Sequence, residues 1–348
     1  MLEDLAIIEG KYLGDILHQP QALENTLAEL KTSKALLDVA ARLNKGKFQR
    51  VVLTGMGSSF HVLHPLNLQL ISHGITVIMV ETSELVHYYE QFFAPKTLII
   101  AVSQSGQSAE TVRLAQANHK GSVIAVTNTP DSALARHANA TVFTKAGSEF
   151  SVSCKTYVAS LMALKWLGDV LCENSLRRTR KELKEACPAV AAYLADWKDS
   201  VRTLVRVLNN TRHLFLVGRG ASLASVGTGA LIVKESDHFH AEGMSSAAFR
   251  HGPFEMLGSE TFVLVFAGDA KTRDLNQRLH DDIRQQNGRS ELIDKDAPLP
   301  CCRIADHGPS IRQILEILPV QMITLALASQ AGREAGRFER TTKVTTTE

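Results

Sequence analysis

Short apolar stretches alternate with amphipathic ones through the first half of the chain, and this alternation predicts a parallel β-sheet. The run TLIIAV at 97–102 is almost entirely apolar, as expected for a strand that is buried on both faces. Five such strands are expected, at Val51–Thr54, Thr76–Val80, Leu98–Val102, Ser122–Val126 and Ala140–Phe143. Strands that alternate with helical segments indicate an α/β fold in which helices cover both faces of the sheet.

The second half of the chain repeats the first. Residues 51–59 (VVLTGMGSS) align without gaps on residues 214–222 (LFLVGRGAS), and the strand at 97–102 aligns on residues 261–266. Each half closes on a long helical pattern, near Ser153–Leu171 and at Ser310–Ser329. The repeat therefore predicts two tandem flavodoxin-like, doubly wound parallel-sheet domains with the strand order 2-1-3-4-5.

The remaining segments are expected to be helical connections. Leu5, Ile8, Tyr12 and Ile16 recur at helical spacing, and Pro20 begins a second helix. The charged segment Glu173–Glu185 is the best candidate for a linker, and one amphipathic helix is expected at Pro188–Leu208. The chain then divides into a helical segment at 1–47, a first domain at 48–175, linker helices at 176–211, a second domain at 212–335 and a C-terminal tail at 336–348.

Composition and charge narrow the class of protein. The net charge of +2 and the lack of a basic stripe give no case for a nucleic-acid partner. The apolar run Ile314–Ala328 contains Glu316, Pro319 and Gln321, so a buried helix is expected there and not a membrane span. The five cysteines include no CxxC pair, which favours a reducing compartment and disfavours a structural zinc site. We therefore expect a cytoplasmic protein.

The loop SQSGQS at 103–108 is the best candidate for a binding site. It joins a buried strand to a helix, so backbone N–H groups, the positive end of the helix dipole and serine hydroxyls all favour an oxyanion such as phosphate. An ordinary N-capping loop is the alternative.

The topology brings a second serine loop, GMGSS at 55–59, to the same crevice. Its GxG pattern lacks the third glycine of a dinucleotide site, although Glu81 follows at a suitable distance. In the second half, AGDAKT takes the place of SQSGQS, and its Asp269 would repel an anion.

A second candidate site lies in the ionisable segment 234–253, KESDHFHAEGMSSAAFRHGP. As a metal site it would use His238 and His240 on one strand face, with Glu242 or His251 completing the ligand set. As a proton-transfer site it would use Glu235 as a base at a helix end and His251 as an acid or base on a turn. From spacing alone, Glu235 could equally be an exposed helical carboxylate.

These motifs together resemble the double sugar-isomerase-domain (SIS) family. That family includes the isomerase half of glucosamine-6-phosphate synthase and related amino-sugar-phosphate isomerases and deaminases. The resemblance covers nearly the whole chain. It is carried by HQPQALENTL (18–27), GMGSS (55–59), SQSGQSAET (103–111), AGSEFSVSCKTY (146–157), GRG (218–220), HAEGMSSAAFRHGP (240–253) and the terminal TTKVTTTE.

The resemblance implies a role for each matching residue. The implied sugar-phosphate binders are Ser58, Ser59, Ser103, Gln104, Ser105 and Ser108. Val152 and Ser153 match a loop that contacts sugar hydroxyls through its backbone, and Glu242 matches a further active-site carboxylate. Among catalytic groups, Glu235 matches the base that moves a proton between C1 and C2. His251 matches the ring-opening histidine that a neighbouring subunit supplies, and Lys343 matches a lysine in a tail that folds over the substrate.

Departures from the family pattern limit what the resemblance implies. Ile232 stands where the synthase has a second lysine, and Ser153–Thr156 replaces a commoner Ala-Ser-Thr-Lys. The segment Arg337–Arg340 replaces the usual Asp-x-Pro-Arg before the C-terminal lysine. The sequence starts Met1-Leu2 without a leading-cysteine module, so we expect no release of ammonia from glutamine.

The resemblance, taken with the residues above, implies a homodimeric, cofactor-free and metal-free phosphosugar isomerase or deaminase that acts on a 6-phosphorylated hexose or amino-hexose through an ene-diol. A non-catalytic sugar-phosphate sensor and a deglycase of fructosyl-amine 6-phosphates are the alternatives. The sequence leaves open which sugar binds, in which direction the reaction runs, and whether Lys343 forms an imine.

Overall fold

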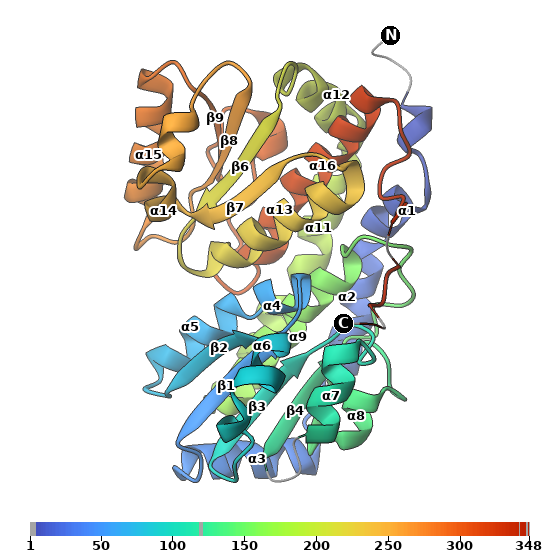
Figure 1. Cartoon of the computed structure of the whole chain (residues 1–348), viewed down its shortest axis with the longest axis vertical. Coiled ribbons are helices and arrows are strands. Elements are labelled where there is room, and N and C mark those ends of the chain that lie inside the picture. Colours follow the sequence, from blue (N-terminus) through green and yellow to red (C-terminus); the bar gives the residue numbers. More distant parts are fainter. Residues whose placement is uncertain (1–4, 118–120, 341, 346, 348) are drawn as a thin grey trace. The chain divides into compact units, whose positions relative to one another are not determined.

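The structure, a computed structural model of the chain, describes residues 5–117, 121–340, 342–345 and 347. The first four residues of the predicted helical segment, and residues 341, 346 and 348 of the predicted tail, lie outside this part. Two compact units are present (Figure 1). We call them the N-sheet unit, the described parts of 21–148, 155–184 and 341–348, and the C-sheet unit, the described parts of 1–20, 149–154 and 185–340.

The N-sheet unit is built on a five-stranded parallel sheet with the order β2-β1-β3-β4-β5. Its strands are β1 (Arg50–Gly55), β2 (Val77–Glu81), β3 (Thr97–Val102), β4 (Ser122–Thr127) and β5 (Ala140–Phe143). Its helices are α2 (Gln19–Glu29), α3 (Lys34–Asn44), α4 (Ser58–His61), α5 (His64–Ser72), α6 (Thr82–Tyr88), η2 (Glu90–Phe92), α7 (Ala109–Ala117), α8 (Ala133–His137), α9 (Lys155–Leu171) and α10 (Leu176–Lys184). The strand order confirms the predicted flavodoxin-like fold, and each strand lies within one residue of its predicted bounds.

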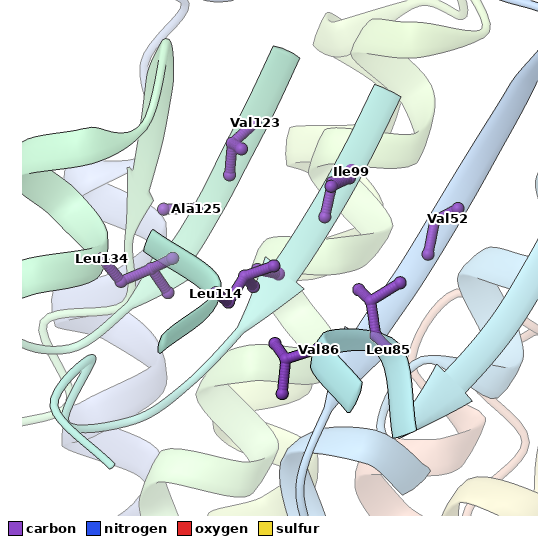
Figure 2. Close-up of a cluster of buried hydrophobic side chains, with 9 residues drawn as sticks. Val52, Leu85, Val86, Ile99, Leu114, Val123, Ala125 and Leu134 are labelled. Atoms are coloured by element: carbon purple, nitrogen blue, oxygen red, sulfur yellow. The ribbon is translucent and has the colours of Figure 1, made fainter. Parts of the chain in front are cut away.

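The core of this unit packs helices α6, α7 and α8 onto one face of the sheet (Figure 2). Val52, Ile99 and Ala125 project from β1, β3 and β4 toward Leu85 of α6 and Leu114 of α7, and all five are almost completely buried. Burying a large apolar side chain is worth about 1.5–3 kcal/mol. Helices α3, α4 and α5 pack against α9, which contacts β4 and β5. The apolar interior of the unit thus lies between the sheet and these helices.

The C-sheet unit repeats this plan with four parallel strands in the order β7-β6-β8-β9. Its strands are β6 (His213–Gly218), β7 (Ala241–Ser245), β8 (Thr261–Phe266) and β9 (Arg289–Ile293). Its helices are η1 (Ala6–Ile8), α1 (Lys11–Leu17), α11 (Ala186–Ala195), α12 (Trp197–Val207), η3 (Gly220–Ser222), α13 (Leu223–Asp237), α14 (Ser246–Arg250), η4 (Pro253–Met256), α15 (Arg273–Gln285), η5 (Pro300–Cys302) and α16 (Arg312–Ala331). The two sheets confirm the predicted tandem repeat, but the described part of the C-sheet has four strands and lacks the fifth strand of the predicted order.

Two of the helical connections differ in detail from the prediction. The single helix expected at Pro188–Leu208 is two helices, because Asp196 (φ −103°, ψ 27°) leaves the helical region between α11 and α12. The charged segment at 173–185 forms helix α10, which packs on α9: Leu183 is buried, and Thr179 Oγ1 donates to Asp169 Oδ2 at 2.6 Å.

Helix α16 is the only helix in the described ranges that is long and apolar enough to cross a membrane. Most of its residues are buried inside the protein, since it packs against α11, α12 and α13. Its apolar composition is therefore that of a core helix, as the sequence predicted.

Candidate functional site

Two serine-bearing loops lie side by side at the carboxyl edge of the N-sheet. Strands β1 and β3 pair in parallel, with Thr54 opposite Ala101, so the loops at 55–59 and 103–108 leave the sheet at neighbouring points. The strand order reverses between these two strands, which is where ligands bind in open α/β sheets. The structure thus brings together six of the residues predicted to bind substrate: Ser58, Ser59, Ser103, Gln104, Ser105 and Ser108.

The second of these loops, which we call the phosphate loop (103–108), is held by its own backbone. Ser103 Oγ accepts a hydrogen bond from Gly106 N at 3.0 Å, and Ser105 Oγ accepts one from Gln107 N at 3.2 Å. A hydroxyl that accepts a hydrogen bond keeps its own proton. Both side chains are therefore oriented and can still donate to an anion.

Gly106 fixes the shape of the phosphate loop. Its φ is +61°, and a Cβ at this position would lie 2.3 Å from Ser132 Oγ. Only glycine fits both the left-handed backbone and the space. The loop is thus specified by one residue that the sequence places in the centre of SQSGQS.

The first serine loop carries an unsatisfied group. Ser58 Oγ is buried and has no hydrogen-bond partner within the described part of the chain. A buried polar atom without a partner costs free energy, about 1–3 kcal/mol, which a ligand that accepts its proton would recover. This orphan hydroxyl belongs to the loop that lies next to the phosphate loop.

The C-terminal tail contacts the helix that follows the phosphate loop. Ala109, the first residue of α7, donates its backbone N–H to Thr345 O at 3.1 Å. Lys343, two residues earlier, is half-buried. The tail therefore satisfies one of the N–H groups that a helix N-terminus leaves unpaired, and it places Lys343 within the N-sheet unit.

The predicted base belongs to the C-sheet unit. Glu235 lies in the last turn of α13 and is half-buried. Tyr12 of α1 and Asp237 lie close to it, and both are buried. Burial raises the pKa of Tyr12 well above its ordinary value, and the nearby charges of Cys154, Asp237 and Glu235 raise it further, while a hydrogen bond to Thr324 Oγ1 at 3.3 Å opposes the shift.

Asp237 is a buried acid that the sequence analysis missed. Burial raises its pKa well above the ordinary value, against the opposing effects of a hydrogen bond from Ser236 Oγ at 3.2 Å and the charge of Arg333. Its Oδ2 has no partner among the described residues. Asp237 follows Glu235 by two residues, but only the packing of α1 and α13 shows that it is buried, so no sequence signal pointed to it.

The segment 149–154, with Val152 and Ser153, belongs to the C-sheet unit and is held there by hydrogen bonds. Phe150 N donates to Asp15 Oδ2 at 2.6 Å, and Ser151 Oγ donates to Gly336 O. The Val152 side chain is fully buried, so this residue can offer a ligand only its backbone. That geometry is compatible with the backbone contact expected of this loop.

His251 and Glu242 lie elsewhere on the C-sheet unit. His251 ends α14 and is exposed. Glu242 is exposed on β7, where its Oε1 lies 3.5 Å from His240 Nε2. Both residues are thus open to solvent in the single chain.

The alternative of a metal pair on a strand is wrong for His238. His238 ends α13 in the left-handed conformation (φ 53°, ψ 32°), and β7 begins only at Ala241, so neither His238 nor His240 lies in the strand. No group of three or more His, Cys, Asp or Glu side chains within the described ranges is placed to hold a metal ion.

Comparison with known proteins gives three consistent results. Glutamine–fructose-6-phosphate aminotransferase (isomerizing) of Pyrococcus horikoshii is 28% identical over 352 residues, which cover 97% of this chain and 57% of the relative. The C-terminal domain of glucosamine-fructose-6-phosphate aminotransferase from Francisella tularensis superposes with a TM-score of 0.79 at 20% identity, over 94% of this chain and 98% of that one. Glucosamine-6-phosphate deaminase from Thermotoga maritima gives 0.77 at 16% identity, over 97% and 100%.

The fold is a tandem pair of doubly wound α/β domains, and two neighbouring serine loops follow β1 and β3 of the first domain. Residues 45–168 and 207–331 each match the SIS domain family. The chain belongs to that family, and its curated relatives include isomerizing glutamine–fructose-6-phosphate aminotransferases. The chain spans less than two thirds of the P. horikoshii relative.

Proposed function

We propose that this protein is a phosphosugar isomerase or amino-sugar-phosphate deaminase that acts on a 6-phosphorylated hexose or amino-hexose. The observation that supports this proposal is the pair of adjacent serine loops in the N-sheet unit. The buried Ser58 hydroxyl has no hydrogen-bond partner among the described residues, and the hydroxyls of Ser103 and Ser105 are oriented by the backbone. Oriented hydroxyls and helix N–H groups are the donors that a phosphate needs.

The proposed chemistry is proton transfer through an ene-diol or ene-diolamine. Glu235 removes a proton from one of the two carbons C1 and C2 and returns it to the other. His251 opens the sugar ring, and Lys343 stabilises the oxyanion of the intermediate. The phosphate supplies remote binding energy that positions the sugar. No cofactor or metal takes part in this scheme, and we place the enzyme in the cytoplasm.

The exposed position of His251 supports a homodimer with composite sites, in which each His251 serves the partner subunit. Mixing two inactive variants, Glu235→Gln and His251→Asn, tests this arrangement. A mixed dimer with composite sites has one site with both residues intact, so mixing under subunit exchange is expected to restore activity. A fully active monomer in analytical ultracentrifugation would contradict the proposal.

Incubation with glucosamine 6-phosphate and with fructose 6-phosphate tests the activity itself. Release of ammonia identifies a deaminase, and conversion of ketose to aldose identifies an isomerase. Binding without turnover, measured by calorimetry, would identify a sensor and overturn the catalytic proposal.

A further inference from the structure

Residues 333–339, which follow α16 and which we call the clasp, are bound to the end of α13 within the C-sheet unit. Arg333 Nη1 donates a hydrogen bond to Asp237 O at 3.2 Å, and the backbone N–H of Gly336 donates one to Ser236 Oγ at 3.1 Å. Asp237 and Ser236 lie in the last turn of α13, which also carries the proposed base. The clasp therefore holds the part of the helix on which proton transfer would depend.

Arg333 joins the two ends of the clasp to each other. Its Nη2 donates to Glu339 Oε1 at 3.0 Å and lies 3.4 Å from His238 Nε2. Glu339 Oε2 lies 3.8 Å from His238 Nδ1, so a proton on Nδ1 faces the carboxylate and leaves Nε2 to accept from Arg333. A guanidinium group presents its N–H donors in a fixed fork, and one side chain can thus hold all of these acceptors together.

The middle of the clasp packs closely on α1, beside which the chain runs after it leaves α16 (Figure 1). Ala335 is buried, and Gly336 has φ at +73°. A Cβ on Gly336 would lie 2.7 Å from Cβ and Cγ of Tyr12, so only glycine fits there. The path of the clasp is thus set by packing in the middle and by Arg333 at its ends.

The clasp also limits how far Lys343 can move from the proposed base. Lys343 follows Glu339 by four residues, and four residues of fully extended chain span at most about 14 Å. Glu339 is itself bound through Arg333 to the turn that carries Glu235. Breaking the contacts of Arg333 would therefore lengthen the free tail and release the end of α13 at the same time.

We propose that Arg333 is a positioning residue, which holds the end of α13 and the start of the tail so that Glu235 and Lys343 act on the same sugar. The inference rests on the proposed function, because it assumes that these two residues act on the substrate. Stability alone does not account for the contact: the Arg333 and Glu339 side chains are 21% and 52% exposed, and ion pairs this close to the surface add little to it.

Steady-state kinetics of Arg333→Gln, with the hexose 6-phosphate that the wild type converts, tests the inference. A misplaced catalytic group loses rate steeply, so kcat is expected to fall by about tenfold or more. KM is expected to stay within about twofold, because the proposed phosphate donors belong to the serine loops of the N-sheet unit. Calorimetry with the same sugar counts the binding-competent sites per chain, which separates a slower enzyme from a smaller folded fraction.

Three further variants sharpen the test. Arg333→Lys keeps the charge but not the fork, and it is expected to recover part of the lost kcat. Glu339→Ala breaks the same contact from the other side, so the double variant with Arg333→Gln is expected to be no slower than Arg333→Gln alone. Arg337→Gln is the matched control: this arginine lies in the same clasp, is 68% exposed and comes no closer than 4.0 Å to Glu334, so kcat stays unchanged.

Three results overturn the inference: Arg333→Gln keeps the kcat of the wild type, its kcat falls only in proportion to the loss of binding-competent sites, or the losses of Arg333→Gln and Glu339→Ala add up in the double variant. Failure of the proposed function looks different, because it is seen in the wild type. In that case the wild type converts none of the hexose 6-phosphates offered, and the positioning role falls with it.

Discussion

The loop after the third strand differs between the two copies of the repeated fold. In the N-sheet unit the loop after the third strand is SQSGQS, with hydroxyls that can donate to an anion. In the C-sheet unit the corresponding loop, 267–272, presents Asp269, whose Oδ1 accepts from Lys271 N at 3.0 Å. The carboxylate thus occupies donors of its own loop. The two copies share the sheet, and the loops after their third strands differ in a few side chains, with hydroxyls in one copy and a carboxylate in the other.

The C-sheet unit has a buried acid beside the segment that follows β6. Glu316 of α16 is fully buried and accepts a hydrogen bond from Ser222 Oγ at 2.9 Å, while its Oε2 has no partner among the described residues. Burial raises its pKa to about 7, helped by the charges of Asp269 and Asp294 and opposed by Ser222 and Arg312. In this copy the Ser222 hydroxyl thus donates to an acid of the protein's own interior.

The largest effect expected from this division is on turnover, because the proposed base lies in the C-sheet unit. Glu235→Gln keeps the shape of the side chain but cannot take up a proton, so the rate is expected to fall by about 10²–10⁴-fold while phosphosugar affinity changes little. Steady-state kinetics and calorimetry on the same preparation measure both. Lys234→Gln, at the exposed neighbouring position, is the control. Retention of most activity by Glu235→Gln would show that another group is the base.

The next largest effect is on the affinity for a hexose 6-phosphate. We expect substitutions in the phosphate loop to lower it, and substitutions in the corresponding loop of the C-sheet unit to leave it unchanged. Replacing Ser103 and Ser105 together by alanine removes two donors to the phosphate, so the affinity for a hexose 6-phosphate is expected to drop by about 100-fold. Thr272→Ala, in the corresponding loop of the C-sheet unit, is expected to leave that affinity unchanged. Equal losses in the two variants would mean that the repeat halves do not divide binding in this way.

A smaller effect compares the glycines of the two loops. Gly106→Ala is expected to lower the free energy of unfolding by about 3 kcal/mol, because the new Cβ meets both a left-handed backbone and Ser132 Oγ at 2.3 Å. Gly268 has a similar φ of +73°, but its nearest neighbours lie 3.5 Å away, so Gly268→Ala should cost only about 1 kcal/mol. Chemical denaturation of the two variants measures the difference, and a larger loss for Gly268→Ala would be incompatible with the loop geometry.

The smallest effect is a pH dependence of the C-sheet unit. The raised pKa of Glu316, about 7 against 4.5 for an ordinary glutamate, stabilises the folded state fully below pH 4.5. This stabilisation is lost as the pH rises through 7. Wild type is therefore expected to lose about 2 kcal/mol relative to Glu316→Gln between pH 5 and pH 8. Parallel denaturant titrations at the two pH values check this, and an unchanged difference would show that Glu316 does not titrate in this range.

Regular patterns made the fold predictable, and packing made part of the site unpredictable. The buried strands and the aligned GMGSS and GRGAS segments carried enough information for the sheet order and for the juxtaposition of Ser58 with Ser103. Tyr12 could not be found in this way, because it approaches Glu235 only through the fold of the C-sheet unit, and the burial of Asp237 is likewise set by packing and not by its place in the sequence. The break at Asp196 was missed because apolar spacing continues across it.

The route of the chain between the two units has a consequence for how the protein can be dissected. Residues 149–154 interrupt the N-sheet unit but are fastened to the C-sheet unit through Asp15 and Gly336, and α1 is fastened there through Tyr12 and Thr324. Cutting the gene after the first repeat would therefore leave the second product without α1 and residues 149–154, and would leave these segments of the first product without their hydrogen-bond partners Gly336 and Thr324. A fragment made by that cut should be a poor folder, whereas reassociation of the two halves in one solution should recover the native packing.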